Sequence, residues 1–149
     1  MSTPVFILNG PNLNMLGKRE PEIYGHTTLA EIEQRCLQLA AELNLDCSFR
    51  QTNFEGQMVE WIHEAYEKGA AVIINPAGFS FHSIPVLDAL KLIEAPLMEV
   101  HISNIHARDA QHRHSIISLV ADGVICGLGP LGYLLGLRAV ADAVESNGR

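Results

Sequence analysis

VFILNGPNLNMLGKREPEIYG, residues 5–25, joins a strand pattern to an unusually long loop. The apolar run Val5–Leu8 predicts a short strand. The loop after it is too long for a simple connector, because most strand-to-helix loops have about two to six residues. Loops of this length are usually lids or binding loops, and this one carries Arg19 and Tyr24 between two glycines. We therefore predict a hinged lid at about residues 17–26.

Short apolar runs alternate with patterns of helical spacing along the chain. The apolar runs are Val5–Leu8, Cys47–Gln51, Ala71–Ile74, Leu97–Ile102 and Gly123–Cys126. Helical spacing is found in Leu29–Leu43, Val59–Tyr66, Leu87–Ile93, Ser115–Val120 and Leu134–Val144, and it is weakest in Ser115–Val120. Such alternation favours right-handed crossovers and a parallel sheet covered by helices on both faces. We predict a single domain, residues 1–149, with a flavodoxin-like, doubly wound, five-stranded parallel sheet in three layers.

Several helix starts are marked by residues that cap N-termini. Thr28 and Glu31 have the spacing of a capping box. Ser83 is a typical N-cap residue, Pro85 follows it in the first turn, and Pro130 opens the last helix. These signals predict where three of the helices begin.

The composition indicates a globular protein and argues against several classes of partner. Of the 149 residues, 48% are apolar and 18% are charged, which is enough apolar surface for a buried core. The net charge of -7, with no cluster of Lys and Arg, argues against a nucleic-acid partner. No apolar run approaches the length of a membrane span and the first residues do not form a signal peptide, so we expect no membrane partner and a cytoplasmic location. Cys36, Cys47 and Cys126 are expected to be buried, reduced thiols.

Polar residues follow the predicted strands at their carboxyl ends. In open parallel sheets of this type, ligands bind beyond these ends, where the strand order reverses. The segments that reach this edge are Asn9–Tyr24, Asn75–Gly78 and His101–Asn104. The fold prediction and the distribution of titratable residues therefore point to the same site.

Glu99 and His101 are two positions apart on a predicted strand, so their side chains lie on the same face. A carboxylate there can orient the imidazole and keep it charged, as a general acid requires. The alternative is a histidine that only caps the strand end. In the lid, a guanidinium near Tyr24 could lower the pKa of the phenol and make it a base. The alternatives are an anchoring aromatic ring at Tyr24 and a solvated charge at Arg19.

Three other motifs do not support their usual functions. His101, His106, His112 and His114 fit no standard zinc spacing, so we predict no metal site. Gly127–Gly132 matches G-x-G-x-x-G, but it follows the last strand and not the first, which favours a tight turn over a dinucleotide site. Gly78–His82 lacks the second glycine of a nucleophile elbow, which argues against a serine hydrolase.

Two long motifs resemble those of type II 3-dehydroquinate dehydratases. They are Asn9-Gly10-Pro11-Asn12-Leu13-Asn14-x-Leu16-Gly17-x-Arg19-Glu20-Pro21-x-x-Tyr24-Gly25 and Glu99-Val100-His101-Ile102-Ser103-Asn104-x-His106-Ala107-Arg108. Shorter matches at Trp61-Ile62-His63, Asn75-Pro76 and Gly127–Tyr133 extend the resemblance over essentially the whole chain. The unrelated Schiff-base type of this enzyme is a barrel that needs about 250 residues.

The resemblance implies reversible loss of water from 3-dehydroquinate to give 3-dehydroshikimate, without a metal or cofactor. This reaction belongs to the shikimate pathway of aromatic amino acid biosynthesis or to quinate breakdown. The resemblance further implies that Tyr24 removes the proton beside the ketone. Arg19 would lower the pKa of the phenol, with help from Arg108, and Asn12 would hold a water that stabilises the enolate.

The same resemblance assigns the acid and the substrate contacts. His101, paired with Glu99, would protonate the departing hydroxyl. Asn75 and the backbone of Ile102–Ser103 would hold the substrate, the latter at its carboxylate. Asp88 would reach the site of a neighbouring subunit, because the family forms trimers that assemble into a dodecamer.

Two positions depart from the family pattern. The family usually has His-Thr where this chain has Phe81-His82, and it usually has Arg where this chain has His112, with Arg113 following. Both changed positions normally contact the ring hydroxyls, so His112 is the candidate contact here. A displacement by one residue turns a side chain by about 100° on a helix, so replacement by His82 or Arg113 would require a local shift.

These departures leave three hypotheses. The first is a 3-dehydroquinate dehydratase. The second is a paralogous dehydratase that keeps the enolate chemistry but prefers a related cyclic hydroxy acid. The third is a non-catalytic, oligomeric binding protein with the same fold.

Overall fold

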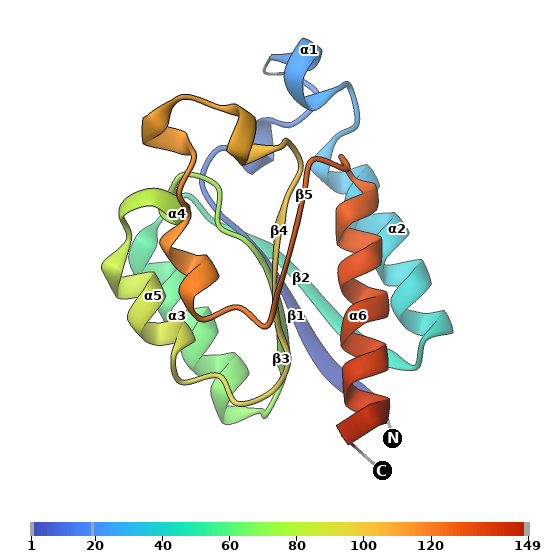
Figure 1. Cartoon of the computed structure of the whole chain (residues 1–149). Coiled ribbons are helices and arrows are strands. Elements are labelled where there is room, and N and C mark those ends of the chain that lie inside the picture. The colour runs from blue at the N-terminus through green and yellow to red at the C-terminus, as the bar shows by residue number, and fades with distance from the viewer. Residues whose placement is uncertain (1, 19, 148–149) are drawn as a thin grey trace.

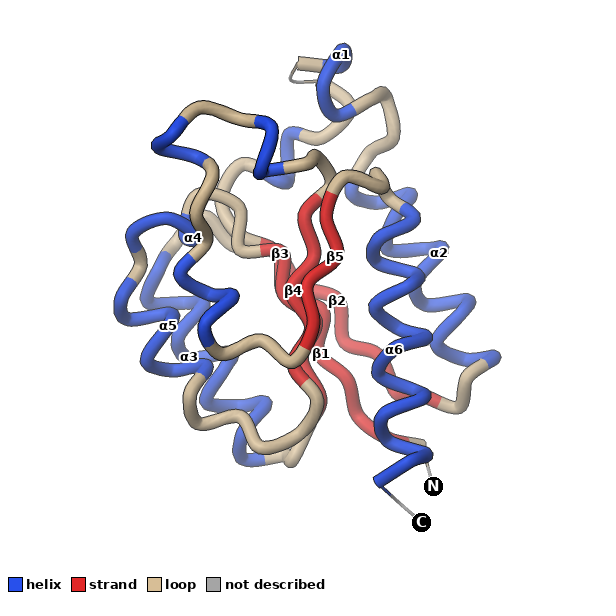
Figure 2. The backbone as a smooth tube through the Cα atoms, in the orientation of Figure 1, coloured by secondary structure: helices blue, strands red, loops and turns tan. Residues whose placement is uncertain are grey.

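The computed structural model describes residues 2–18 and 20–147 and contains a parallel five-stranded sheet. The strands are β1 (Thr3–Asn9), β2 (Leu45–Gln51), β3 (Ala71–Asn75), β4 (Leu97–His101) and β5 (Gly123–Cys126). Their order across the sheet is β2-β1-β3-β4-β5, and all neighbouring pairs are parallel (Figure 2). The predicted flavodoxin-like fold is confirmed, and each predicted strand is present.

Helices cover both faces of the sheet, which makes three layers (Figure 1). They are α1 (Pro21–Tyr24), α2 (Leu29–Glu42), α3 (Glu55–Glu67), α4 (Phe79–His82), α5 (Ile84–Leu90) and α6 (Leu131–Asn147). Helices α2 and α6 pack on one face, and α3 and α5 pack on the other (Figure 1). Alternate residues of the interior strand β1 belong to two separate hydrophobic cores: Val5 and Ile7 to one, and Phe6 and Leu8 to the other. This period of two is the expected pattern for a strand covered on both sides.

Two predicted caps are confirmed by their hydrogen bonds. The hydroxyl of Thr28 accepts a hydrogen bond from the backbone N–H of Glu31 (3.2 Å) at the start of α2. The hydroxyl of Ser83 accepts one from the N–H of Val86 (3.2 Å) at the start of α5. Each bond satisfies a backbone donor that the first helical turn leaves unpaired.

The prediction of an α-helix at Ser115–Val120 is wrong. The chain instead forms a short 3-10 helix, η4 (Ile116–Leu119), because only Ile117 is buried there and Leu119 is 79% exposed. One buried side chain does not make the apolar stripe that would dock a longer α-helix. Three more 3-10 turns occur: η1 (Leu13–Met15), η2 (Ile105–Ala107) and η3 (Ala110–His112).

The strand order reverses between β1 and β3, and their carboxyl ends lie side by side there. Gly10 follows β1, and its N–H donates a hydrogen bond to the carbonyl of Asn75 (2.9 Å). A Cβ atom at Gly10 would lie 2.3 Å from the carbonyl oxygen of Pro76, so this close approach requires glycine. No helix among the described residues is both long and apolar enough to cross a membrane.

Candidate active site

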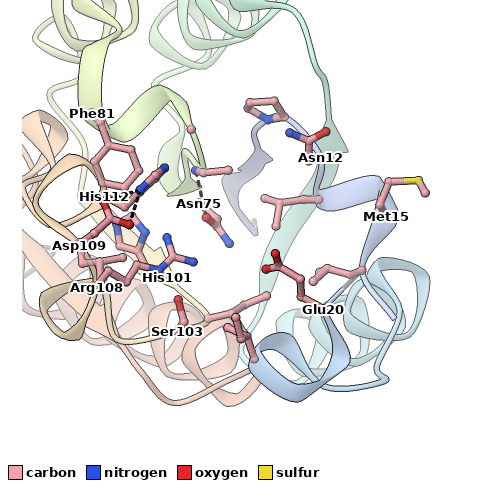
Figure 3. A pocket seen from close by; sticks show the side chains of 18 residues that line it. Asn12, Met15, Glu20, Asn75, Phe81, His101, Ser103, Arg108, Asp109 and His112 are labelled. Atoms are coloured by element: carbon pink, nitrogen blue, oxygen red, sulfur yellow. Dashed lines mark hydrogen bonds and ion pairs between the residues drawn. The ribbon is translucent and has the colours of Figure 1, made fainter. Parts of the chain in front are cut away.

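A pocket of about 480 Å³ opens beyond the carboxyl ends of β1, β3 and β4. This is the position that the topology predicts for a ligand site. Figure 3 shows Asn75 between two groups of side chains, with Arg108, Asp109 and His112 on one side and Met15 and Glu20 on the other. The full lining is Pro11, Asn12, Leu13, Met15, Leu16, Glu20, Ile23, Asn75, Ala77, Gly78, Phe81, His101, Ile102, Ser103, Ile105, Arg108, Asp109 and His112.

The predicted pair of Glu99 and His101 is formed at the end of β4. The two side chains point to the same face of the strand, and Nε2 of His101 is hydrogen-bonded to Oε2 of Glu99. Glu99 is fully buried, whereas His101 reaches the pocket and is 4% exposed. The imidazole therefore has one nitrogen fixed by a carboxylate, which leaves Nδ1 for a ligand.

Burial and hydrogen bonding shift the pKa of Glu99 in opposite directions. Burial would raise the pKa of its carboxyl group, because the charged form loses its hydration. The hydrogen bond with His101, the hydroxyl of Ser115 and a hydrogen bond from the hydroxyl of Ser118 (2.6 Å) favour the charged form and hold the pKa of Glu99 below its ordinary value. Glu99 is thus a buried, charged carboxylate hydrogen-bonded to the imidazole of His101.

A buried tyrosine joins the ends of β1 and β3 beneath the pocket. The hydroxyl of Tyr133, on α6, donates to Oδ1 of Asn9 (2.6 Å) and accepts from Nδ2 of Asn75 (2.8 Å). Oδ1 of Asn75 also accepts from the backbone N–H of Ala77 (3.2 Å). Burial raises the pKa of Tyr133, so it remains a neutral phenol with a donor and an acceptor. These bonds fix the amide of Asn75 in one orientation at the pocket wall.

The loop after β1 presents Asn12 in an unusual backbone conformation. Asn12 has a φ of 70°, in the left-handed region that asparagine tolerates better than most residues. Its N–H donates to Oδ1 of Asn53 (2.9 Å), and Nε2 of Gln51 donates to the carbonyl of Gly10 (3.1 Å). Residues at the end of β2 therefore hold the loop that carries Asn12 to the pocket.

Ile102, Ser103 and Arg108 line the pocket from the segment after β4. Ile102 is buried and directly follows His101, so this backbone lies next to the imidazole. Arg108 brings a guanidinium to the same wall (Figure 3). A carboxylate ligand would contact the backbone of Ile102–Ser103 and the guanidinium of Arg108 here, and these groups are suited to binding an anion.

The two departures from the family pattern contact each other. The rings of Phe81 and His112 meet edge to face with their centroids 5.3 Å apart. Nδ1 of His112 lies 2.9 Å and 3.0 Å from the two carboxylate oxygens of Asp109, which lowers the pKa of Asp109. We call Phe81, Asp109 and His112 the variant wall.

Arg113 and His82, the neighbours of His112 and Phe81, do not supply the missing family side chains to the pocket. The guanidinium of Arg113 donates to the carbonyl of Arg108 through Nε (3.1 Å) and Nη2 (2.7 Å), so it is used outside the pocket. His82 is exposed and does not line the pocket either. The local shift that would bring Arg113 or His82 into place is not present.

Arg19, Tyr24 and Asp88 are predicted site residues that are not among the described side chains lining this pocket. Arg19 lies outside the described residues. The backbone of Tyr24 forms the end of α1, but its side chain is also outside the description. Asp88 is exposed on α5, pairs with Lys91 at 3.4 Å, and does not line this pocket. The roles predicted for these residues stay predictions.

The structure adds site residues that the sequence did not single out. Glu20 and Asp109 line the pocket, Ser118 contacts Glu99, and Tyr133 contacts Asn75. Asp109 could have been found from its position three residues before His112, which places both on one turn. The contacts of Ser118 and Tyr133 join distant segments and leave no local signal. Among the described residues, no group of three metal-ligating side chains is placed to hold a metal ion.

Comparison with known proteins gives a consistent result. The family described as dehydroquinase class II matches residues 3–141. A 3-dehydroquinate dehydratase from Brucella canis is 55% identical, and the alignment covers 100% of this chain and 97% of that protein. The crystal structure of a type II dehydroquinase from Propionibacterium acnes has a TM-score of 0.92 and 46% identity, with 95% of this chain and 98% of that chain covered.

A second solved structure supports the same assignment. The type II dehydroquinase from Butyrivibrio crossotus has a TM-score of 0.91 and 32% identity, with 93% of this chain and 97% of that chain covered. Sequence and structure agree over nearly the full length of each protein. We conclude that this chain belongs to the class II dehydroquinase family.

Proposed function

We propose that the protein is a 3-dehydroquinate dehydratase that works without a metal or cofactor. The observation that carries the proposal is the buried Glu99–His101 pair at the strand-end pocket of a chain in this family. Elimination through an enolate needs a base, a group that stabilises the anion and an acid, all shielded from water. The pocket and its lid contain a candidate for each.

The proposed reaction begins with proton removal. The Tyr24 phenolate takes a proton from the carbon beside the ketone, and the electron pair of that C–H bond forms the enolate. Arg19 and Arg108 favour the ionised phenol by their positive charge. Asn12 holds a water that donates a hydrogen bond to the enolate oxygen.

The second step expels water. The enolate re-forms the ketone, a carbon–carbon double bond forms, and the hydroxyl on the next carbon leaves with its bonding electrons. His101 gives that hydroxyl a proton, so the leaving group departs as water by trans elimination. Asn75 and the backbone of Ile102–Ser103 hold the substrate, and His112 contacts its ring hydroxyls.

Assembly is part of the proposal, because Asp88 is assigned to a neighbouring subunit's site. We propose a homo-oligomer, a dodecamer built from trimers. Large apolar side chains that are exposed in the single chain support association: Phe54 is 74% exposed, Ile84 is 54% exposed and Leu119 is 79% exposed.

The test is an ultraviolet assay for the conjugated enone product of 3-dehydroquinate. We expect turnover by the wild type and a loss of about 10²–10⁴-fold in kcat for Tyr24→Phe, which removes the base. Tyr66→Phe, on the exposed surface of α3, is the matched control and should retain activity. A wild type that does not turn over 3-dehydroquinate would refute the proposal.

One observation favours a second candidate, a dehydratase with altered substrate preference. The variant wall places an aromatic ring and an imidazole where the family usually has His and Arg. Turnover of another cyclic hydroxy ketone acid with a higher kcat/KM than 3-dehydroquinate would favour this candidate. Binding of these acids without turnover would favour a non-catalytic protein.

A further inference from the structure

Ser118 is the third member of a hydrogen-bonded chain that ends at His101. Its hydroxyl donates to Oε1 of Glu99 at 2.6 Å, while Oε2 of Glu99 contacts Nε2 of His101. Ser118 comes from η4 and Glu99 from β4, so two elements meet at this carboxylate. Each oxygen of Glu99 thus accepts or shares one side-chain hydrogen bond, and the buried hydroxyl of Ser115, which has no other hydrogen-bond partner among the described residues, also favours the charged carboxylate.

The need for the Ser118 hydroxyl follows from the burial of Glu99. The carboxylate has no exposed surface, so water does not compensate an unpaired oxygen. Leaving a buried charged oxygen without a donor costs more than a typical hydrogen bond contributes. Without Ser118, the carboxylate would take up a proton or rotate toward another donor. Either change weakens its contact with His101.

The immediate surroundings of the pair offer few charged substitutes. In the sheet register, Glu99 lies between Ile74 of β3 and Val124 of β5, and His101 lies beside Cys126. Among the described residues, the charged or titratable groups that line the pocket with His101 are Glu20, Arg108, Asp109 and His112. The hydroxyl of Ser118 donates the hydrogen bond from η4 to the carboxylate, and the hydroxyl of Ser115, the N-cap residue of η4, also favours the charged form of Glu99.

We propose that Ser118 is a positioning residue whose hydroxyl holds the Glu99 carboxylate against His101 and so keeps the imidazole in one orientation beside its counter-charge. The proposal deepens the proposed function, because it concerns the group assigned as the general acid. Ser118 itself does not line the pocket, so it acts through Glu99.

Removal of the Ser118 hydroxyl could change the pKa of His101 in two ways, and the direction of the change shows whether the hydroxyl positions Glu99 or acts only through its dipole. If Glu99 stayed in place and ionised, loss of the hydroxyl dipole would strengthen its pull on the proton of His101 and raise the pKa of the imidazole. If Glu99 moves or is neutralised, His101 loses its counter-charge, and its pKa falls. The proposal requires the second result.

The test compares Ser118→Ala with Ser118→Thr, which keeps the hydroxyl, and with Ser80→Ala. Ser80 is a suitable control because its hydroxyl is buried and has no hydrogen-bond partner among the described residues. We would titrate the His101 ring protons by NMR, assigned by their loss in His101→Asn, and measure kcat for 3-dehydroquinate against pH.

For Ser118→Ala we expect the midpoint of the His101 NMR titration to move to lower pH by about one unit, as the loss of one hydrogen bond to a charged group predicts. The pH above which kcat declines should move by the same amount. We expect kcat to fall about tenfold near neutral pH. Ser118→Thr and Ser80→Ala should follow the wild type. An unchanged midpoint, a midpoint at higher pH, or an equal shift in Ser80→Ala would overturn the proposal. The NMR titration needs no turnover, so it decides the role of Ser118 even if 3-dehydroquinate is not the substrate.

Discussion

Two carboxylate–imidazole pairs line or approach the same pocket, but they lie in opposite environments. In Glu99–His101 the side chains are 0% and 5% exposed, and in Asp109–His112 they are 66% and 50% exposed. The first pair sits at the end of a central strand, and the second sits on a 3-10 turn in the loop after it. Hydrogen bonding lowers the pKa of the carboxyl group in both.

The two pairs have the same types of side chain and differ in burial. We infer that the buried pair is suited to proton transfer and the exposed pair to ligand contact. Charges interact far more strongly in the protein interior than in water, so the buried Glu99 carboxylate can hold the ring of His101 firmly in place. An exposed pair is screened by solvent and ions, so Asp109 mainly orients the ring of His112. The predictions below test this contrast.

The largest effect is expected when the buried carboxylate loses its charge. Glu99→Gln should lower kcat by about 10²–10⁴-fold, because His101 loses the counter-charge that keeps it an acid. Asp109→Asn is the matched change in the exposed pair and should alter kcat by less than about threefold. Steady-state kinetics on both variants would measure the contrast, and equal losses in kcat would contradict it.

The two pairs should also differ in their contribution to folding. Glu99→Ala leaves His101 buried without its partner, so we expect a loss of about 3–5 kcal/mol in the free energy of unfolding. Asp109→Ala should cost less than about 1 kcal/mol, because that pair is exposed. Urea unfolding at one fixed protein concentration would compare them. A cost below about 1 kcal/mol for Glu99→Ala would contradict the strong coupling of the buried pair.

A third contrast is in the pH dependence of stability. The pKa of Glu99 is lower in the folded chain than its ordinary value of 4.5, so the folded state binds fewer protons than the unfolded state. Its contribution to stability is therefore fully present above pH 4.5 and is lost as the pH falls through the lower, folded value. Urea midpoints measured between neutral and acidic pH should fall more steeply for wild type than for Glu99→Gln. Asp109→Asn should flatten the curve less than Glu99→Gln, because the lowered pKa of Asp109 belongs to an exposed, screened carboxylate. Parallel curves for wild type and Glu99→Gln would contradict this.

The smallest effect is expected within the variant wall. Because Phe81 and His112 are in contact, restoring one family residue alone removes an aromatic contact without rebuilding the usual pair. We expect His112→Arg and Phe81→His to be non-additive in KM for 3-dehydroquinate, with a coupling of about 0.5–1.5 kcal/mol in a double-mutant cycle. Additive effects on KM would show that the two positions act independently.

Local sequence patterns were sufficient to predict most of the fold. The central strands have continuous apolar runs, and Thr28 and Ser83 cap helices through bonds that span three residues. The prediction failed at Ser115–Val120, where a weak apolar spacing could not reveal that a single side chain is buried. Strand ends were also predictable, which is why Asn75 and His101 were correctly expected at one edge of the sheet.

The rest of the site depends on contacts that no local pattern encodes. Ser118 and Glu99 are 19 residues apart, and Tyr133 and Asn9 are 124 residues apart. Motif spacing identifies residues on one strand or turn, whereas these partners come together only through tertiary packing.

The bridge made by Tyr133 has a consequence for the order of events during synthesis. Asn9 and Asn75 are made early in synthesis, but the Tyr133 hydroxyl that links them is on α6, the last helix. A nascent chain can therefore pair β1 with β3 while its pocket still lacks this link. The contact between Tyr133 and Asn9 closes a long loop of chain, which is slow compared with local folding. The pocket wall around Asn75 should thus acquire its final shape only after α6 has left the ribosome and docked.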